Sequence, residues 1–492
     1  MEVWTQIGQF LLLAINFIWR HILLLNFVFS IIIIFFQRKE PKSAWAWLLV
    51  LNAIPGLGFL LYLLAGTDMH KRKMFQIKGY EDLMNEAVRR QESSVRSREL
   101  EQENPDLKGF SDLVFYNLES SGAMLTTDNQ VRIFTDGNEK FDALIEDIRQ
   151  AREYVFLQYY IVKNDVLFSR VREVLIQKIS QGVEVFLLYD AMGCREMPRK
   201  YWRELEKTGI RLAVFFPALF GRMQLRANYR NHRKIAIIDG EIGYVGGFNI
   251  GKEYIGLDPK FGHWRDTHLR ITGGAVTALT IRYIQDWNYA ARENLFASQK
   301  YVRYPERPCG HTDIQIISSG PDSVRQNIRD NYLRLIHKAK KRIFVQTPYY
   351  IPDESIHMAL LIAAQSGVEV NVMIPCKPDH PFVYWATYSY IGELVMAGAN
   401  CYTYDNGFLH AKGVCIDGEA CCYGTANMDI RSFSLNFEVN AMIYDEKVAQ
   451  EMERIFAEDL KLCTRISRDA YRSRSLWIRV KEQVSRLLSP VL

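Results

Sequence analysis

The sequence predicts an α/β protein built from two similar halves and preceded by two membrane-spanning helices. Three observations lead to this prediction: charge-free apolar blocks near the N-terminus, a repeated order of strand-like and helix-like segments, and a polar motif that occurs once in each half. The chain has 492 residues, of which 48% are hydrophobic. This length exceeds one ordinary domain and suffices for two or three hydrophobic cores.

The first 66 residues are predicted to form a membrane anchor of two transmembrane helices. Residues 44–66 carry no charged side chain and reach about 34 Å at about 1.5 Å per helical residue, which is enough to cross a bilayer core. The earlier charge-free block, residues 22–36, is shorter, so that a full span needs residues before it, with Arg20 extending toward the interface. The sequence leaves open whether residues 8–36 cross the membrane fully or lie partly at its surface.

Charges beside the predicted spans indicate their orientation. Two spans leave both flanks on one side of the membrane, and the basic residues at 71–78 favour the cytoplasm for the part that follows. The basic loop at 38–42 argues the other way. We expect a multi-pass protein of the inner (plasma) membrane with a cytoplasmic catalytic part.

The rest of the chain is predicted to comprise a charged linker, two α/β halves and a basic C-terminal helix: 67–108, 109–300, 301–464 and 465–492. Three strand-like segments alternate with helical ones in each half: 154–162, 182–190 and 209–215, then 342–351, 367–375 and 398–404. Gly209 and Gly398 stand where a helix should end. This order predicts βαβ layers with largely parallel strands.

Each half also carries the motif H-x-K-x₄-D followed by an asparagine. The asparagine stands 17 positions after the histidine in both halves, from 232 to 249 and from 410 to 427. Period-2 alternation along a strand places the histidine and lysine of one motif on the same face. One such motif is weak evidence, whereas two copies on repeated halves indicate a shared site. The candidate catalytic residues are therefore His232, Lys234, Asp239, Asn249, His410, Lys412, Asp417 and Asn427.

These residue types suit the cleavage of a phosphodiester. Lysines and asparagines can neutralise and hold the phosphoryl oxygens without a metal ion or other cofactor. One histidine can attack phosphorus and form a covalent phosphohistidine, while the other protonates the leaving alcohol and later deprotonates the incoming one. Repeat symmetry leaves open which histidine attacks. The downstream carboxylates Asp266 and Glu438 are expected to bond the far ring nitrogens and fix the tautomers.

The two motif aspartates have a different interpretation. Asp239 precedes Gly240 and Asp417 precedes Gly418, each at an apparent turn. Aspartate and glycine are typical of tight turns. We therefore expect a structural turn or salt-bridge role for both aspartates rather than a direct part in the chemistry.

Composition argues against a metal protein and against a nucleic-acid-binding protein. The eight cysteines form no C-x-x-C pair and several lie in apolar runs, which predicts reduced, buried thiols and no zinc site. The formal net charge is only +5, which is too small to indicate a nucleic-acid partner.

At these motifs the chain resembles the phospholipase D superfamily and, more narrowly, the bacterial cardiolipin synthases. The blocks that carry the likeness are residues 246–273, 347–354, 407–418, 424–445 and 485–492. The likeness covers nearly the whole chain, including the paired N-terminal spans. It implies two phospholipase D-like halves in a pseudo-twofold, bilobal catalytic domain, with one active site between them that contains both histidines, both lysines and both asparagines.

The resemblance implies that two phosphatidylglycerol molecules condense to cardiolipin and glycerol without a nucleotide or a catalytic metal. In related two-motif enzymes the first histidine is usually the nucleophile. The motifs do not separate acceptor alcohols, so that a phospholipase D-type hydrolase and a phosphatidylserine synthase remain alternatives. A nuclease of the same superfamily and a non-catalytic lipid-binding protein are alternatives of another class. The expected partners are an anionic phospholipid and the membrane, without nucleic acid, and a homo-oligomer is left open.

Two further segments carry hypotheses of membrane contact. The first half has an insertion before its motif, in which Phe216, Leu219 and Phe220 lie among arginines. This loop either dips into the membrane interface or packs against the protein. In the tail from Arg465, apolar residues recur at helical spacing among seven Lys and Arg residues. The tail helix either lies on anionic lipid or docks on the second half.

Overall fold

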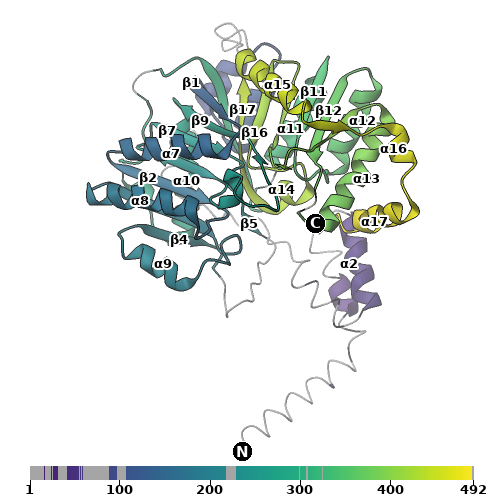
Figure 1. The fold of residues 1–492 in the computed structure, drawn as a ribbon, viewed down its shortest axis with the longest axis horizontal. Coiled ribbons are helices and arrows are strands. Elements are labelled where there is room, and N and C mark those ends of the chain that lie inside the picture. Colours follow the sequence, from purple (N-terminus) through teal and green to yellow (C-terminus); the bar gives the residue numbers. More distant parts are fainter. Residues whose placement is uncertain are drawn as a thin grey trace, which may run out of the picture. The chain divides into compact units, whose positions relative to one another are not determined.

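The structure is a computed structural model that describes residues 107–489 except 218–228, 299, 306–307, 324 and 378, together with 88–96, 41–54 and scattered positions before residue 63. Figure 1 shows the ribbon coloured along the sequence. The chain divides into two compact units, residues 1–72 with 218–229 and residues 73–217 with 230–492.

The first unit contains helix α2 (Pro41–Ala53). Leu51 of this helix is buried, and the side-chain amide of Asn26 donates a hydrogen bond to the Leu51 carbonyl at 2.8 Å. Trp47 and Tyr62 make an edge-to-face contact with their ring centroids 5.3 Å apart. These contacts give the described part of the unit a small apolar cluster.

Within the part of the chain that the structure describes, no helix combines the length and the apolarity needed to cross a bilayer. Parts of both predicted spans lie outside the described residues. The same holds for Leu219 and Phe220 of the predicted membrane loop, whereas Phe216 at its start is buried.

The first half of the second unit follows the predicted alternation of strands and helices. Its elements are α6 (Ser111–Ser121), β1 (Leu125–Phe134), α7 (Gly137–Gln150), β2 (Tyr154–Tyr159), α8 (Val166–Ser180), β3 (Glu184–Asp190), α9 (Arg199–Glu206), β4 (Arg211–Phe215), β5 (Arg230–Asn231), β6 (Ile235–Ile238), β7 (Ile242–Gly246), η3 (Lys252–Ile255), β8 (Trp264–Arg265), β9 (His268–Thr272), α10 (Ala275–Ala291) and η4 (Leu295–Ala297).

The second half repeats this order and ends in two short helices. Its elements are β10 (Thr312–Ser319), α11 (Asn327–Lys338), β11 (Arg342–Gln346), α12 (Glu354–Gln365), β12 (Glu369–Pro375), α13 (Pro381–Ala397), β13 (Asn400–Tyr404), β14 (Phe408–Leu409), β15 (Gly413–Ile416), β16 (Ala420–Gly424), α14 (Ile430–Ser434), β17 (Asn436–Tyr444), α15 (Glu446–Leu460), β18 (Cys463–Arg465), α16 (Arg468–Arg472) and α17 (Leu476–Leu487).

The two halves share one mixed sheet. Its strand order is β18-β13-β12-β11-β15-β16-β17-β10-β1-β9-β7-β6-β2-β3-β4, with β5 paired to β17 beside this path. Strand β1 joins the halves, because its first part pairs with β10 of the second half and its last part pairs with β9 of the first. Both pairings are antiparallel. The repeat therefore produces one continuous sheet rather than two separate ones.

The expectation of largely parallel strands is confirmed for the six segments that alternate with helices, β2-β3-β4 and β11-β12-β13, but was wrong for the sheet as a whole. Apart from these, the short pairs β5-β17 and β8-β14 are also parallel. The strands around each motif are antiparallel: β6 pairs with β2 and β7, and β15 pairs with β11 and β16. The physical reason is the length of the connection. A short turn joins β6 to β7 and β15 to β16, and a parallel crossover needs a dozen residues or more.

Glycines end the helices as the sequence predicts. Gly398 closes α13 with φ +109°, and its N–H donates to carbonyls of the last helical turn. Gly209 follows α9 with φ +96°. A left-handed residue at this place is inexpensive for glycine alone, because glycine has no Cβ.

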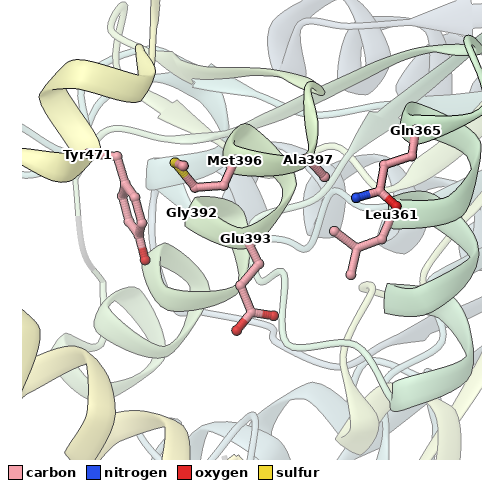
Figure 2. A pocket seen from close by; sticks show the side chains of 7 residues that line it. All are labelled: Leu361, Gln365, Gly392, Glu393, Met396, Ala397 and Tyr471. Atoms are coloured by element: carbon pink, nitrogen blue, oxygen red, sulfur yellow. The ribbon is translucent and has the colours of Figure 1, made fainter.

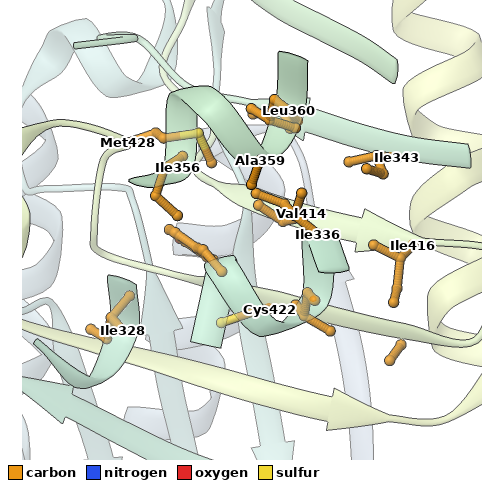
Figure 3. Close-up of a cluster of buried hydrophobic side chains, with 14 of the residues drawn as sticks. Ile328, Ile336, Ile343, Ile356, Ala359, Leu360, Val414, Ile416, Cys422 and Met428 are labelled. Atoms are coloured by element: carbon orange, nitrogen blue, oxygen red, sulfur yellow. The ribbon is translucent and has the colours of Figure 1, made fainter. Parts of the chain in front are cut away.

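Each half has its own hydrophobic core between sheet and helices. In the second half, Ile336 of α11 and Ile356 and Leu360 of α12 lie against Val414 and Ile416 of β15 (Figure 3). Cysteine side chains act as apolar groups there, since Cys401, Cys415, Cys421 and Cys422 are fully buried. These two cores hold the sheet on which the motifs lie.

The Asp-Gly turns after the two motif strands are built alike. Asp239 and Asp417 are both left-handed, with φ +54°. The Asp417 carboxylate accepts the backbone N–H groups of 340, 341 and 342 at 2.7–2.9 Å, which fixes the start of β11. Asp239 accepts those of 152, 153 and 154 in the same way. The turn interpretation of both aspartates agrees with this geometry.

We predict that Asp417→Ala lowers the stability of the full chain by about 2–4 kcal/mol, because three backbone donors lose a charged acceptor and alanine disfavours positive φ. Asp417→Asn should cost less, since asparagine tolerates the left-handed conformation and keeps one acceptor oxygen. Thermal unfolding in detergent measures both losses. A variant that loses turnover while it keeps its melting temperature would assign the carboxylate to the chemistry instead.

Candidate active site

Short strand pairs between the halves position the two histidines. β5 pairs in parallel with the start of β17, and the backbone N–H of His232 donates to the Phe437 carbonyl at 3.0 Å. β14 pairs in parallel with β8, and the N–H of His410 donates to the Arg265 carbonyl at 2.7 Å. Each motif therefore begins against a strand of the other half.

The imidazole side chains are also paired with residues of the other half. Nδ1 of His232 lies 2.9 Å from Oε1 of Glu438, and Nδ1 of His410 lies 2.5 Å from Oδ2 of Asp266. Both carboxylates are fully buried. Asp266 and Glu438 were expected to bond the far ring nitrogens, but the sequence did not indicate which histidine each would take. In the structure each carboxylate serves the histidine of the opposite half.

The electrostatics of the pairs fix the tautomers. Burial by itself would raise the pKa of Asp266, but Lys412 and His410 together hold it below its usual value. Burial by itself would likewise raise the pKa of Glu438, but His232 and Lys234 hold it below its ordinary value. Because both carboxylates are ionised, each can accept a proton from the adjacent Nδ1, which favours the Nδ1–H tautomer; at His410 the ammonium of Lys412 also lies 2.7 Å from Nδ1. Each Nε2 is then left with a lone pair.

Both histidines are neutral at neutral pH. Burial and the nearby Lys412 lower the pKa of His410 to about 3. Burial also lowers the pKa of His232 below its ordinary value, against the opposing effect of Glu438. Lys412 lowers the pKa of His232 and Lys234 lowers that of His410. This reciprocal influence indicates that the two motifs form one electrostatic site.

The motif lysines lie beneath their own histidines. Nζ of Lys234 donates to the His232 carbonyl at 2.6 Å, and Nζ of Lys412 donates to the His410 carbonyl. Lys412 also lies 3.8 Å from Oδ2 of Asp266. Burial lowers the pKa of Lys412 to about 8 and lowers that of Lys234 well below its ordinary value. A buried lysine in its ammonium form makes the site attractive to an anion.

The two asparagines are not equivalent. Asn249 uses both ends of its amide inside the first half, since its oxygen accepts the N–H of Ile161 and its nitrogen donates to the Tyr254 hydroxyl, each at 3.0 Å. Asn427 is buried, and its Oδ1 has no hydrogen-bond partner among the described residues. Asn427 is thus the asparagine with polar capacity left for a ligand.

Asp239 and Asp417 are the two motif residues that the structure does not bring to the histidines. Each stands at the far end of its short strand, β6 or β15, from the histidine of its motif. Their carboxylates are engaged by the backbone amides described above. Both were included among the candidate catalytic residues, and their contacts are those of turn residues.

Several residues around the pairs were not singled out in the sequence. Thr425 donates its hydroxyl to Oε2 of Glu438 at 2.5 Å. Tyr160 contacts the His232 ring and Trp264 contacts the His410 ring, both at 5.0 Å between centroids. Sequence proximity was the available signal, since Thr425 stands two positions before Asn427 and Trp264 two before Asp266.

Two arginines were also missed. Arg233, inside the first motif, is buried and pairs with Asp286 of α10 at 2.6 Å. Arg265 pairs with Asp459 of α15 at 2.7 Å, which links the first half to the second. A buried charged residue needs a buried partner of opposite charge, but the sequence does not show which one.

No group of three or more His, Cys, Asp or Glu residues suited to a metal ion occurs among the residues that the structure describes. A cavity of about 360 Å³ lies between α12, α13 and α16, and the residues that line it include none of the motif residues. This cavity is thus separate from the paired histidines and lysines.

Comparisons with known proteins agree on one family. Residues 144–259 and 332–460 match the family model described as cardiolipin synthase, PLD-like domain, and residues 24–66 match the model described as phospholipase D-nuclease N-terminal. The chain is 48% identical to a cardiolipin synthase of Listeria innocua over 96% of this chain and 98% of the relative. It is 47% identical to the major cardiolipin synthase ClsA of Bacillus subtilis over 95% and 98% of the two chains.

Another relative is a cardiolipin synthase of Oceanobacillus iheyensis, which is 47% identical over 98% of this chain and 99% of its own. Among solved structures, a phosphatidylserine synthase of Haemophilus influenzae matches with a TM-score of 0.59 at 13% identity, over 74% of this chain and 95% of that one. At this identity the structural match supports the fold alone.

The exchanged pairs generate a prediction for the carboxylates. Asp266→Asn and Glu438→Gln should each lower phospholipid turnover by about 10²–10⁴-fold, because an amide no longer stabilises the imidazolium and can impose the wrong tautomer. Turnover and thermal stability are measured together on the full chain. Asp142→Asn, at an exposed ion pair with Arg170, is the matched control and should keep full turnover. Normal turnover in either test variant would remove the pair from the mechanism.

Proposed function

The chain belongs to the cardiolipin synthases of the phospholipase D superfamily, and we propose that it transfers a phosphatidyl group from one phosphatidylglycerol to the glycerol hydroxyl of another. The products are cardiolipin and free glycerol. The observation that carries the proposal is the pair of buried histidine–carboxylate contacts made across the halves of a chain that matches cardiolipin synthases over nearly its full length.

The first chemical step is attack by one histidine. Nε2 of this imidazole forms a bond to phosphorus, and the bond from phosphorus to the glycerol headgroup oxygen breaks. The second histidine gives that oxygen a proton, and glycerol leaves. The carboxylate on each Nδ1 stabilises the positive charge that its ring acquires, which supports the use of both exchanged pairs in one cycle.

The second step reverses the roles. The terminal hydroxyl of another phosphatidylglycerol attacks the phosphohistidine, the second histidine removes its proton, and the phosphorus–nitrogen bond breaks. One phosphate ester replaces another, so that the reaction needs no nucleotide to drive it. Water in place of this hydroxyl would give phosphatidic acid, which is how a hydrolase of the same superfamily would differ.

Substrate binding allows one histidine to take up from solvent the proton that the leaving group needs. Both histidines are neutral in the free site, since burial lowers their pKa values. A phosphodiester anion held beside Lys234 and Lys412 would stabilise an imidazolium and so raise the pKa of the histidine that acts as the acid. The two lysines are the groups placed to bind the phosphoryl oxygens, whereas the unpartnered Oδ1 of Asn427 can accept a hydrogen bond from a substrate hydroxyl.

The N-terminal unit fits the proposal as a membrane anchor. Its residues 24–66 match the N-terminal family model, and residues 44–66 carry no charge. We infer two spans with the catalytic halves on the cytoplasmic side of the inner membrane, where an enzyme with two lipid substrates would meet both. Insertion of a glycosylation or cysteine-labelling site at residues 38–42 would test this topology.

The proposed reaction predicts stoichiometric products. Purified full chain with labelled phosphatidylglycerol and EDTA, and without nucleotide, should form cardiolipin and glycerol in equal amounts. His232→Ala and His410→Ala should each lower the rate to near background, since each histidine has a separate role. Phosphatidic acid as the sole product would show a hydrolase, and full turnover in either variant would contradict the mechanism.

The same variants distinguish nucleophile from acid. A phosphatidyl ester of p-nitrophenol has a leaving group that needs no proton. The variant that lacks only the acid should therefore still release nitrophenolate in a burst and retain the lipid label on the protein, whereas the variant that lacks the nucleophile should do neither.

Lys412 generates a prediction for pH. Its pKa of about 8 lies below the ordinary lysine value because it is buried, and only the ammonium form neutralises a phosphoryl oxygen. kcat/KM, which depends on the free protein, should therefore fall as pH rises through about 8. The anionic substrate raises the pKa of Lys412 once it is bound, so that the corresponding fall in kcat should occur at higher pH. In Lys412→Arg this fall should disappear, since arginine keeps its charge. An unchanged profile in Lys412→Arg would assign the titration to another group.

A further inference from the structure

The C-terminal tail is docked on the second half. Tyr471 of α16 covers Gly392 of α13 so closely that a Cβ at Gly392 would lie 1.7 Å from the tyrosine ring (Figure 2). In α17, the Arg486 guanidinium pairs with Glu393 of α13. Lys481 places its ammonium 5.1 Å from the Trp385 ring centroid. Figure 1 shows α17 next to α13 at the rim of this half.

The face of α17 that meets the protein is polar. Its fully buried residues are Glu482 and Ser485. The Glu482 carboxylate accepts two hydrogen bonds from Nε of Arg474 at 2.9 Å. A surface helix of a globular domain ordinarily turns its apolar face inward. In α17 this arrangement is inverted.

The apolar residues of α17 consequently point outward. Leu476, Trp477 and Leu487 are 77%, 75% and 82% exposed, and Val480 and Val484 are about half exposed. Positions 476, 480, 484 and 487 are four, four and three residues apart, so that they form one stripe along the helix. We call these four residues, together with the neighbouring Trp477, the apolar stripe. An exposed stripe of this size marks an interaction surface.

Charge around the stripe indicates its partner. The segment from Arg465 carries seven Lys and Arg residues against Asp469 and Glu482, and Glu482 is already neutralised by Arg474. Arg472, Arg479 and Lys481 are exposed. A basic rim around an apolar stripe with a tryptophan matches the interface of an anionic bilayer, where tryptophan concentrates and basic side chains meet lipid headgroups.

We propose that α17 is a membrane-docking helix whose apolar stripe inserts into the interface of an anionic bilayer while its polar face holds the second half. The catalytic part would then contact the membrane through the tail as well as through the N-terminal unit. The sequence left two interpretations of the tail, docking on the protein or lying on lipid. In this proposal both apply, because opposite faces of α17 make the two contacts. The inference rests on the proposed function only for the lipid nature of the substrate.

The test compares bilayers with micelles in the full chain. The stripe variant Leu476→Ser/Val480→Ser/Leu487→Ser changes exposed residues and should fold. With phosphatidylglycerol vesicles its kcat/KM should fall by about fivefold or more, and in detergent micelles it should stay within about twofold of the parent. The control Val166→Ser/Leu462→Ser removes exposed apolar residues from α8 and from the turn between α15 and β18, and its kcat/KM should be unchanged in both.

A second readout does not depend on the reaction. Brominated acyl chains in anionic vesicles should quench the fluorescence of the full chain more than that of Trp477→Phe, because Trp477 reaches the bilayer. Equal quenching in the two proteins would overturn the docking helix even if cardiolipin is formed. Extra quenching without cardiolipin formation would keep the helix and reject only the proposed reaction.

Two other outcomes would assign the stripe a role other than membrane binding. A fall in the particle mass of the stripe variant, measured by light scattering in detergent, would show that the stripe joins two copies of the chain. Equal loss of kcat/KM in vesicles and micelles would show that the stripe supports the protein itself. Either result overturns the proposal.

Discussion

Two buried histidine–carboxylate pairs, each made between the halves of the chain, are the contacts on which the site depends. His232 relies on Glu438 of the second half, and His410 relies on Asp266 of the first. Each half therefore takes the carboxylate partner of its histidine from the other half. The same exchange appears in the backbone, where β5 pairs with β17 and β14 pairs with β8. The pairing of β1 with β10 joins the halves in one continuous sheet, which holds these contacts between the halves in place.

The site buries several charges, and their arrangement explains the pKa directions. A buried ion costs several kcal/mol unless it is paired and hydrogen-bonded. Asp266 and Glu438 meet this cost through His410, His232 and the lysines, and both carboxyl pKa values fall. Lys412 remains partly uncompensated, and its pKa falls to about 8. An anionic substrate would relieve this imbalance, so that the empty site is less stable than the filled one.

Other buried ions hold the halves together at the same place. Arg265 crosses from the first half to Asp459 in the second, and Arg233 donates through Nε to the Glu438 carbonyl. Because these arginines stand next to Asp266 and His232 in sequence, they fix the backbone from which the paired carboxylate and imidazole side chains project. The distribution of charge thus serves alignment more than net stability, since buried ion pairs add little stability by themselves.

The duplicated motif, its spacing and its family likeness could be read from the sequence, because they depend on residue order alone. The strand–helix alternation predicted the six strands that alternate with helices and run parallel, since hydrophobic runs and terminal glycines act locally. The Asp-Gly turns were also predictable, and they explain why the motif strands run antiparallel. The turn itself is local, whereas the backbone N–H groups that donate to each aspartate carboxylate lie between 75 and 87 positions away in sequence.

Tertiary structure alone decided which carboxylate serves which histidine. Glu438 and His232 are 206 positions apart and Asp266 and His410 are 144 apart, so that no local pattern could pair them. The same holds for the inequivalence of Asn249 and Asn427, which arises from their neighbours in space. Likewise, the helical spacing in the tail revealed an amphipathic helix but not that its polar face would be the buried one. The sequence determines which residues each segment can bury, and only the tertiary structure determines which residues they are packed against.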